Sequence, residues 1–387
     1  MSQESKLSAA EPSHQSNAEY PILIIPGYIA SCLYTKNGFK FWGGFGGIFT
    51  MFTHLPIKNK GYVKHNHTNQ TETNPKAREY GSLKIHSELI NRLCAEFPHR
   101  PVYFFSYDWR QSYYDSAELL DEEISWIIEK HSSKKVDVIT HSMGGLLISA
   151  YAKKHGFGSL NTIITLAAPY EGTNQMYYTV LASLSERKNA AAVSDYPFID
   201  NHSVNYSWLS NNFGFLWKKI SPDFPSYFDV SVSDAYIAEF QAGNSPADRY
   251  KVNGAEMSLD DYAAVGTSVN ASHFYRSQQF YHDIRAVLLK YDKSYFAYAQ
   301  GYNTVSAVEF AVKPARCTAS QRKLSVSRLI WRDGDQVVPV LSAVMLGKLF
   351  SLKPDRDHSF HANHITILKD SACIDWVLDI LNSEQKA

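Results

Sequence analysis

The most informative stretch of the chain is VDVITHSMGGLL, residues 136–147, where an apolar strand runs through a sharp turn into a helix. The turn has the form small-x-Ser-x-Gly, with Thr140 at the first small position. A serine in such a turn occupies a strained backbone position, and Gly144 lets the helix pass close to the strand. The helix N-terminus directs the Met143 N–H to the place where negative charge develops on an attacked ester. We therefore predict Ser142 as a nucleophile and Met143 as an oxyanion-hole donor.

Short apolar strands and amphipathic helices alternate around this turn, from residue 20 to about residue 170. The predicted strands cover 22–25, 102–105, 136–139 and 162–166, and the predicted helices cover 83–97, 117–130 and the segment from near 143 to 154. The alternation implies a mostly parallel central sheet with helices on both faces. It resumes with a strand at 329–331, a helix at 341–349 and a final helix at 365–381. Together with the serine turn, this pattern predicts an α/β-hydrolase fold.

A nucleophilic serine needs a histidine as its base and an acid that orients the histidine, in the chain order Ser, acid, His in this fold. Asp335 follows the predicted strand at 329–331 and precedes an apolar pair, so we predict it as the acid. Asp333 is the competing candidate, and an aspartate that only shapes the loop is the structural alternative. His364 directly precedes the final helix and is the predicted base, with His361 as the next candidate.

The second oxyanion-hole donor is expected in the loop after the first strand. Residues 25–29 read IPGYI, in which Gly27 allows a tight turn. The backbone N–H of Tyr28 is the best candidate for the donor. Its side chain is either a pocket wall or a surface ring, and the sequence leaves both open.

Three histidines at spacings of three, His358, His361 and His364, suggest a metal site at first sight. No carboxylate or thiol cluster supports that interpretation, and no CxxC or Cys/His pattern occurs. We expect neither a metal nor another cofactor.

The balance of charged residues limits the classes of partner that the protein is expected to bind. The 387 residues carry 38 Lys and Arg against 38 Asp and Glu, so the formal net charge is zero. A nucleic-acid binder would carry a basic excess, and so would a polybasic membrane anchor. The predicted partner is a lipid substrate, with a transient, apolar contact to the membrane surface.

The aromatic residues divide the chain unevenly. Residues 170–310 hold 27 of the 53 aromatic residues, leaving 26 for the other 246 positions. A satellite core of Tyr and Phe explains this enrichment, and a cap over an apolar, lipid-facing cleft is compatible with it. The predicted organisation is a disordered lead at 1–19, a hydrolase core at 20–170 and 321–387 with a lid loop at 37–80, and an aromatic-rich cap inserted at 171–320.

The first 17 residues are polar and lack the apolar region of a secretory signal. No stretch approaches the ~18 uninterrupted apolar residues of a membrane helix. The cysteines are widely spaced and read as reduced thiols. We expect a cytoplasmic or peripheral membrane protein.

Six blocks spread through the chain add a resemblance to these residues. The chain resembles the lecithin:cholesterol acyltransferase family, which includes lysosomal phospholipase and phospholipid:diacylglycerol acyltransferases. The matching blocks are IPGYIAS at 25–31, YDWR at 107–110, HSMGG at 141–145, APYEGT at 168–173, DGDQVVP at 333–339 and HITIL at 364–368.

The resemblance implies a serine acyl hydrolase or O-acyltransferase that acts on glycerophospholipids through an acyl-Ser142 intermediate. It implies a lid at 37–80 in which Trp42 is an apolar lid residue. In the block at 107–110, either Asp108 or Trp109 shapes the acyl pocket, or Asp108 and Arg110 form an ion pair that fixes the loop after the strand. The alternatives are a triacylglycerol or carboxyl-ester lipase, a glycolipid deacylase, and an inactive hydrolase-like protein that binds lipid or a partner.

Overall fold

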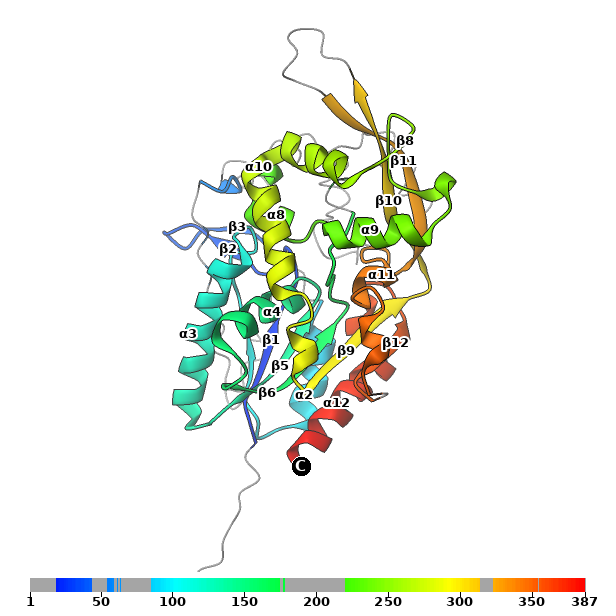
Figure 1. Ribbon diagram of the computed structural model, residues 1–387. Coiled ribbons are helices and arrows are strands. Elements are labelled where there is room, and N and C mark those ends of the chain that lie inside the picture. The colour runs from blue at the N-terminus through cyan, green and yellow to red at the C-terminus, as the bar shows by residue number, and fades with distance from the viewer. Residues whose placement is uncertain are drawn as a thin grey trace, which may run out of the picture.

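A computed structural model describes most of the chain (Figure 1), the described residues being 19–43, 54–58, 61, 63, 85–174, 177, 220–313, 323–353 and 355–386. At its centre lies a six-stranded sheet with the order β12–β9–β6–β5–β1–β4. Neighbouring strands in this sheet run parallel. In chain order the strands are β1 (Ile22–Ile25), β4 (Val102–Phe104), β5 (Val136–His141), β6 (Leu160–Leu166), β9 (Ser294–Gln300) and β12 (Asp357–His361).

Both faces of the central sheet are covered, and every residue of β1, β5 and β6 is buried. In β1, Ile22 and Ile24 belong to one hydrophobic cluster, and Leu23 and Ile25 belong to the other. Helices α2 and α12 contribute to the first cluster, and α3 and α4 contribute to the second. The bounds of these helices are α2 (Ser87–Glu96), α3 (Tyr113–His131), α4 (Gly144–His155) and α12 (Ser371–Lys386). The predicted α/β-hydrolase layering is confirmed.

A second, smaller sheet lies beyond the carboxyl ends of the central strands (Figure 1). Its order is β11–β10–β7–β8, and β10 pairs antiparallel with β11 along a long hairpin. A two-stranded ribbon, β2–β3, stands apart from both sheets. The bounds are β2 (Leu33–Tyr34), β3 (Lys40–Trp42), β7 (Lys251–Val252), β8 (Ala255–Glu256), β10 (Tyr302–Lys313) and β11 (Lys323–Gly334).

Helices α8, α9 and α10 lie over the same end of the central sheet (Figure 1). Helix α10 is kinked at Asn270, where φ is −160° and ψ is 102°. Tyrosines of this region pack into the main hydrophobic cluster, which favours the satellite-core interpretation for the described part of the aromatic excess; they are Tyr177, Tyr227, Tyr236, Tyr250, Tyr262 and Tyr281. The helix bounds are α8 (Pro225–Asp229), α9 (Asp234–Gly243) and α10 (Leu259–Ile284). The described residues also form short 3-10 turns: η3 (Ser221–Asp223), η4 (Pro246–Asp248), η5 (Leu288–Lys290), η6 (Lys348–Ser351) and η7 (Thr366–Leu368).

The division into core and cap differs from the prediction at two strands. β9 lies inside the predicted cap range of 171–320, yet it pairs with β6 and β12 in the central sheet. β11 contains the predicted strand at 329–331, which the prediction assigns to the core, but it pairs with β10 in the second sheet. The pairing of β9 with β6 spans more than 100 residues, and β11 continues the hairpin that begins in β10. Local apolar patterns report neither pairing.

Two predicted helices are also corrected. The helix expected at 341–349 is a short α11 (Val340–Ala343) followed by the turn η6, because Met345, Leu346 and Gly347 all have positive φ. The final helix begins at Ser371 and not at Ile365, since the turn η7 intervenes.

Most of the predicted lid at 37–80 and the lead at 1–18 lie outside the described residues. Cys32 and Cys94 are partly exposed and Cys373 is buried, and Cys317 lies outside the described part. Among the helices that the structure describes, none has the length and apolar character needed to cross a membrane.

Candidate active site

Ser142 stands in the turn between β5 and α4 with a positive φ of 55°. Its backbone N–H donates to the Leu166 carbonyl at 2.8 Å, which ties the turn to the neighbouring strand β6. A Cβ at Gly144 would lie 2.4 Å from the Ile25 carbonyl oxygen, so only glycine fits between α4 and β1. A Cβ at Gly145 would lie 2.4 Å from the Ala168 Cβ. This close packing explains the two glycines after the serine turn and holds the strained serine in place.

Ser142, His364 and Asp335 form a continuous chain of hydrogen bonds. The Nε2 atom of His364 lies 2.8 Å from the Ser142 Oγ, and its Nδ1 atom lies 2.8 Å from the Asp335 Oδ2. The three residues are 8%, 5% and 1% exposed, respectively. Because the carboxylate accepts from Nδ1, the other ring nitrogen is available to take the serine proton. The structure therefore brings the three predicted residues together in the geometry of a catalytic triad.

The Asp335 carboxylate is fixed by its own loop. Its Oδ1 atom accepts the backbone N–H groups of Val337 and Val338 at 2.9 and 2.6 Å, which leaves Oδ2 directed at His364. The competing candidate Asp333 accepts from the Gly301 N–H at 2.6 Å and is exposed.

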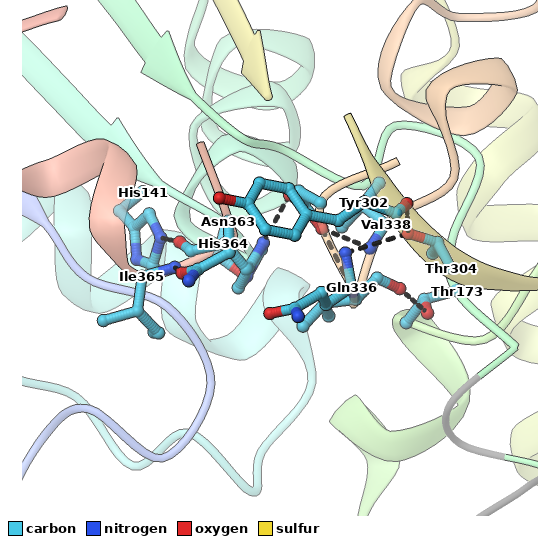
Figure 2. Close-up of polar contacts among 12 residues, drawn as sticks. His141, Thr173, Tyr302, Thr304, Gln336, Val338, Asn363, His364 and Ile365 are labelled. Atoms are coloured by element: carbon cyan, nitrogen blue, oxygen red, sulfur yellow. Dashed lines mark hydrogen bonds and ion pairs between the residues drawn. The ribbon is translucent and has the colours of Figure 1, made fainter. Parts of the chain in front are cut away.

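Two threonines from other parts of the chain support the acid loop, as Figure 2 shows. The Thr304 Oγ1 accepts the Gln336 N–H at 2.8 Å, and Gln336 has a positive φ of 77°. The Thr173 hydroxyl donates to the Val337 carbonyl at 2.5 Å. Sequence reasoning missed both threonines, because neither stands in a recognisable motif and each reaches the loop only through the tertiary fold.

The backbone of His364 is held on both sides. Its N–H donates to the Asp335 carbonyl at 2.9 Å. Its own carbonyl oxygen lies 2.8 Å from the His141 Nε2, and the two rings lie side by side in Figure 2. The Asn363 side chain accepts the N–H groups of Ile365 and Thr366 at 3.0 and 2.9 Å, which shapes the turn after the histidine.

A row of buried imidazoles extends behind His364. The ring of His141 lies 5.0 Å from that of His364, and the ring of His86 lies 5.4 Å beyond it. Burial lowers the pKa of His86 to about 3. Burial also lowers the pKa of His141 well below its usual range, and the nearby His364 and His86 add to the effect. His141 is therefore neutral, and its protonated Nε2 donates to the carbonyl oxygen of His364.

The loop after β1 lies directly against the serine. A Cβ at Gly27 would lie 2.8 Å from the Ser142 Cβ, so this position requires glycine. The Tyr107 hydroxyl donates to the Pro26 carbonyl at 2.9 Å and fixes the start of the loop. Tyr28 follows Gly27 in the chain, and Met143 follows Ser142 at the start of α4. The two predicted donors thus belong to the two segments that meet at the serine.

Trp42 and Trp109 pack beside this loop. Trp109 is fully buried and contacts Tyr28 and Trp42 edge-on, with ring centroids 5.0 and 5.1 Å away. Phe224 lies 6.0 Å from the Trp109 ring, on the side of the cap. The Trp42 indole N–H donates to the Ile29 carbonyl at 2.7 Å.

Asp108 is part of a buried ion pair. Its carboxylate binds the Arg110 guanidinium through two contacts of 2.8 and 2.6 Å. Arg110 also donates to the Leu55 carbonyl at 2.8 Å, and a Cβ at Gly61 would lie 2.6 Å from the Asp108 carboxylate. These contacts favour the loop-fixing alternative for Asp108, since the pair holds described parts of the segment 54–61.

The other two histidines of the run, His358 and His361, pack on aromatic side chains. His361 stacks on Tyr302 with centroids 5.4 Å apart, and His358 packs on Phe360 and Trp376. In the described part of the chain, no group of three or more His, Cys, Asp and Glu side chains is placed to hold a metal ion.

Comparisons with known proteins agree with this architecture. Residues 104–211 match a family described as the PGAP1-like alpha/beta domain. A chain of the Tle4–Tli4 complex superposes with a TM-score of 0.63 and 13% identity, covering 95% of this chain and 98% of that one. The chain therefore has the α/β-hydrolase fold.

Two curated relatives match this chain over shorter segments. An uncharacterized protein of Saccharomyces cerevisiae is 43% identical over 68 residues, which is 17% of this chain and 10% of the relative. A putative GPI inositol-deacylase C of Yarrowia lipolytica is 24% identical over 144 residues, which is 33% of this chain and 17% of the relative. The matches thus span less than a fifth of either relative, and the resemblance to the lecithin:cholesterol acyltransferase family stays a prediction.

Proposed function

We propose that this α/β-hydrolase cleaves acyl esters of lipids through a covalent acyl-Ser142 intermediate. The observation that carries the proposal is the hydrogen-bonded chain Ser142–His364–Asp335 at a serine with positive φ. A buried serine of this geometry is activated by the adjacent base and attacks a carbonyl carbon.

In the proposed reaction, His364 accepts the Ser142 proton while the Ser142 Oγ attacks the ester carbonyl. The backbone N–H groups of Tyr28 and Met143 stabilise the tetrahedral oxyanion. Loss of one such donor typically raises the barrier by about 2.7–4 kcal/mol. His364 then returns the proton to the leaving alcohol, and the acyl group stays on Ser142 until a water or an alcohol accepts it. Asp335 holds the ring orientation and stabilises the imidazolium that forms transiently.

Three features support a lipid as the substrate. The matched family is described as the PGAP1-like alpha/beta domain, and one relative is named a putative GPI inositol-deacylase. The rings of Trp42, Trp109 and Phe224 form an aromatic cluster with Tyr28 of the oxyanion loop, and this cluster favours an apolar acyl chain. We infer that the enzyme works at a membrane surface, with transient contact.

Two substrate classes remain as specific proposals. The six sequence blocks favour a glycerophospholipid, with release of the acyl chain or its transfer to an alcohol. The match to a putative GPI inositol-deacylase favours an acyl ester on a glycolipid head group.

One experiment separates these proposals. Wild-type and S142A proteins are incubated with vesicles that contain labelled phospholipid, triacylglycerol or inositol-acylated glycolipid, each with and without diacylglycerol. We expect Ser142-dependent release of fatty acid from one lipid class, and diacylglycerol-dependent formation of a new ester if the enzyme is a transferase. Full activity of S142A would refute the serine mechanism. A wild type that neither hydrolyses any ester nor reacts with a fluorophosphonate would favour a lipid-binding protein.

A further inference from the structure

The oxyanion loop carries an unusual backbone at Ile29. The residue has a positive φ of 59°, although β-branched side chains rarely adopt this region. It stands in a turn that the Ala30 N–H closes on the Gly27 carbonyl at 3.3 Å. Glycine is the usual residue where a turn needs positive φ. The turn that presents Tyr28 is therefore strained, and it persists only where its surroundings hold it.

Hydrogen bonds from two parts of the fold hold this turn. On the side of the core, the Tyr107 hydroxyl donates to the Pro26 carbonyl, and the Tyr107 N–H donates to the Ser31 hydroxyl at 3.2 Å. At the strained residue itself, the Trp42 indole N–H donates to the Ile29 carbonyl at 2.7 Å. Trp42 ends β3, so its hydrogen bond to Ile29 comes from the β2–β3 ribbon and not from the central sheet.

We propose that Trp42 is a positioning residue, whose indole N–H holds the strained turn at Ile29 and so keeps the Tyr28 N–H directed at the oxyanion. The inference rests on the proposed serine mechanism and deepens it. With negative φ at Ile29, the peptide planes on both sides of that residue turn. Tyr28 lies between Ile29 and Gly27, which packs on the Ser142 Cβ, so we expect this rotation to displace the proposed Tyr28 donor.

This role differs from that of an acyl-pocket wall. A wall residue contributes to substrate binding in the ground state, so its loss raises KM. A residue that positions an oxyanion donor acts in the transition state, so its loss lowers kcat and leaves KM nearly unchanged. The contact also ties the competence of the oxyanion hole to the conformation of the β2–β3 ribbon.

The test uses W42F, which keeps an aromatic ring beside Trp109 and removes the indole N–H. We expect kcat on a short-chain ester to fall by about 10- to 100-fold, with KM within about twofold of wild type. The affinity for an alkylboronic acid, which forms a tetrahedral adduct with a serine hydroxyl, should fall by the same factor. W126F is the matched control, because Trp126 lies on α3 and packs there on Lys130 and on Tyr103 of β4. It should change neither quantity by more than about twofold.

If W42F folds poorly, replacement of Trp42 by 3-benzothienylalanine preserves the ring size and removes only the N–H. A kcat and a boronate affinity within about twofold of wild type in a folded variant would overturn the role of Trp42. A parallel loss of activity and of folded protein, with unchanged boronate affinity per folded molecule, would also overturn it. A wild type that hydrolyses no ester would instead refute the proposed function, so the two failures are distinguishable.

Discussion

The Nε2 atom of His141 lies 2.8 Å from the backbone carbonyl oxygen of His364. His141, which directly precedes Ser142 in the chain, thus holds His364, whose ring contacts the Ser142 hydroxyl. Since a carbonyl oxygen only accepts, this contact fixes the tautomer of His141 with its proton on Nε2. The remaining nitrogen, Nδ1, is buried and has no hydrogen-bond partner in the described structure.

We predict that H141L lowers kcat by about tenfold and leaves KM nearly unchanged, because His364 loses one of its two backbone contacts and its ring shifts relative to the Ser142 Oγ. H141Q should retain more activity, since the Gln amide reaches toward the same carbonyl with a donor. Steady-state kinetics of the two variants with one soluble ester check this. Equal activity of H141L and wild type would show that the contact does not position His364.

The buried imidazoles predict a loss of stability in acid. The pKa of His86 is about 3 in the folded protein, against an ordinary value near 6.5, so the folded protein binds fewer protons than the unfolded chain between these values. Stability is therefore complete above about pH 6.5 and falls as the pH decreases, by up to about 1.4 kcal/mol per pH unit for each such histidine. His141, whose pKa is also lowered by burial, acts in the same sense.

Urea unfolding of wild type and H86F between pH 7.5 and 4.5 measures this slope. H86F should reduce it by about 1.4 kcal/mol per pH unit in the acidic range. Asp229, whose pKa burial raises to about 7, changes stability in the opposite sense, and the comparison of two variants cancels its contribution. The control H282A removes a histidine that is 79% exposed and should leave the slope unchanged. An unchanged slope in H86F would contradict the assignment of a depressed pKa.

The sequence predicted those parts of the molecule that local patterns encode. The strands β1, β4, β5 and β6 are short apolar runs, and each was expected within two residues of its observed bounds. β9 reads SYFAYAQ, whose apolar run does not stand out in an aromatic-rich region, and β12 reads DHSFH, which has no apolar run. Their places depend on pairing with β6 and with each other, which no local pattern reports.

The active site likewise has one part that the sequence predicts and one part that it does not. The chain order Ser, acid, His, together with a position after a predicted strand and one before the final helix, selected Asp335 and His364, which the structure brings into contact. The support of the acid loop by Thr304 was not predictable, because it depends on where β10 crosses that loop. A threonine in a strand has no sequence signal that separates this role from ordinary packing.

We predict that T304V lowers both stability and activity. The substitution preserves the shape of the side chain and removes the acceptor of the Gln336 N–H, which costs about 1–3 kcal/mol in a buried site. The acid loop should then hold Asp335 less firmly, and kcat should fall by about tenfold. The matched control is T140V, because the buried Thr140 hydroxyl has no hydrogen-bond partner in the described structure. T140V should keep or raise stability in urea unfolding, and equal losses in both variants would contradict the prediction.

The strained backbone at Ser142 should lower the stability of the folded protein. With φ at 55°, Ser142 stands where glycine is favoured over residues with a Cβ, so S142G should be more stable than S142A by about 1 kcal/mol. Both variants lack the nucleophile and should be inactive. Ser149 provides the control, because it lies inside α4, where alanine is favoured over glycine by about 1 kcal/mol. Urea unfolding of the four variants should therefore give opposite orders at the two positions. The same order at both would show that Ser142 does not occupy the strained backbone that the turn imposes.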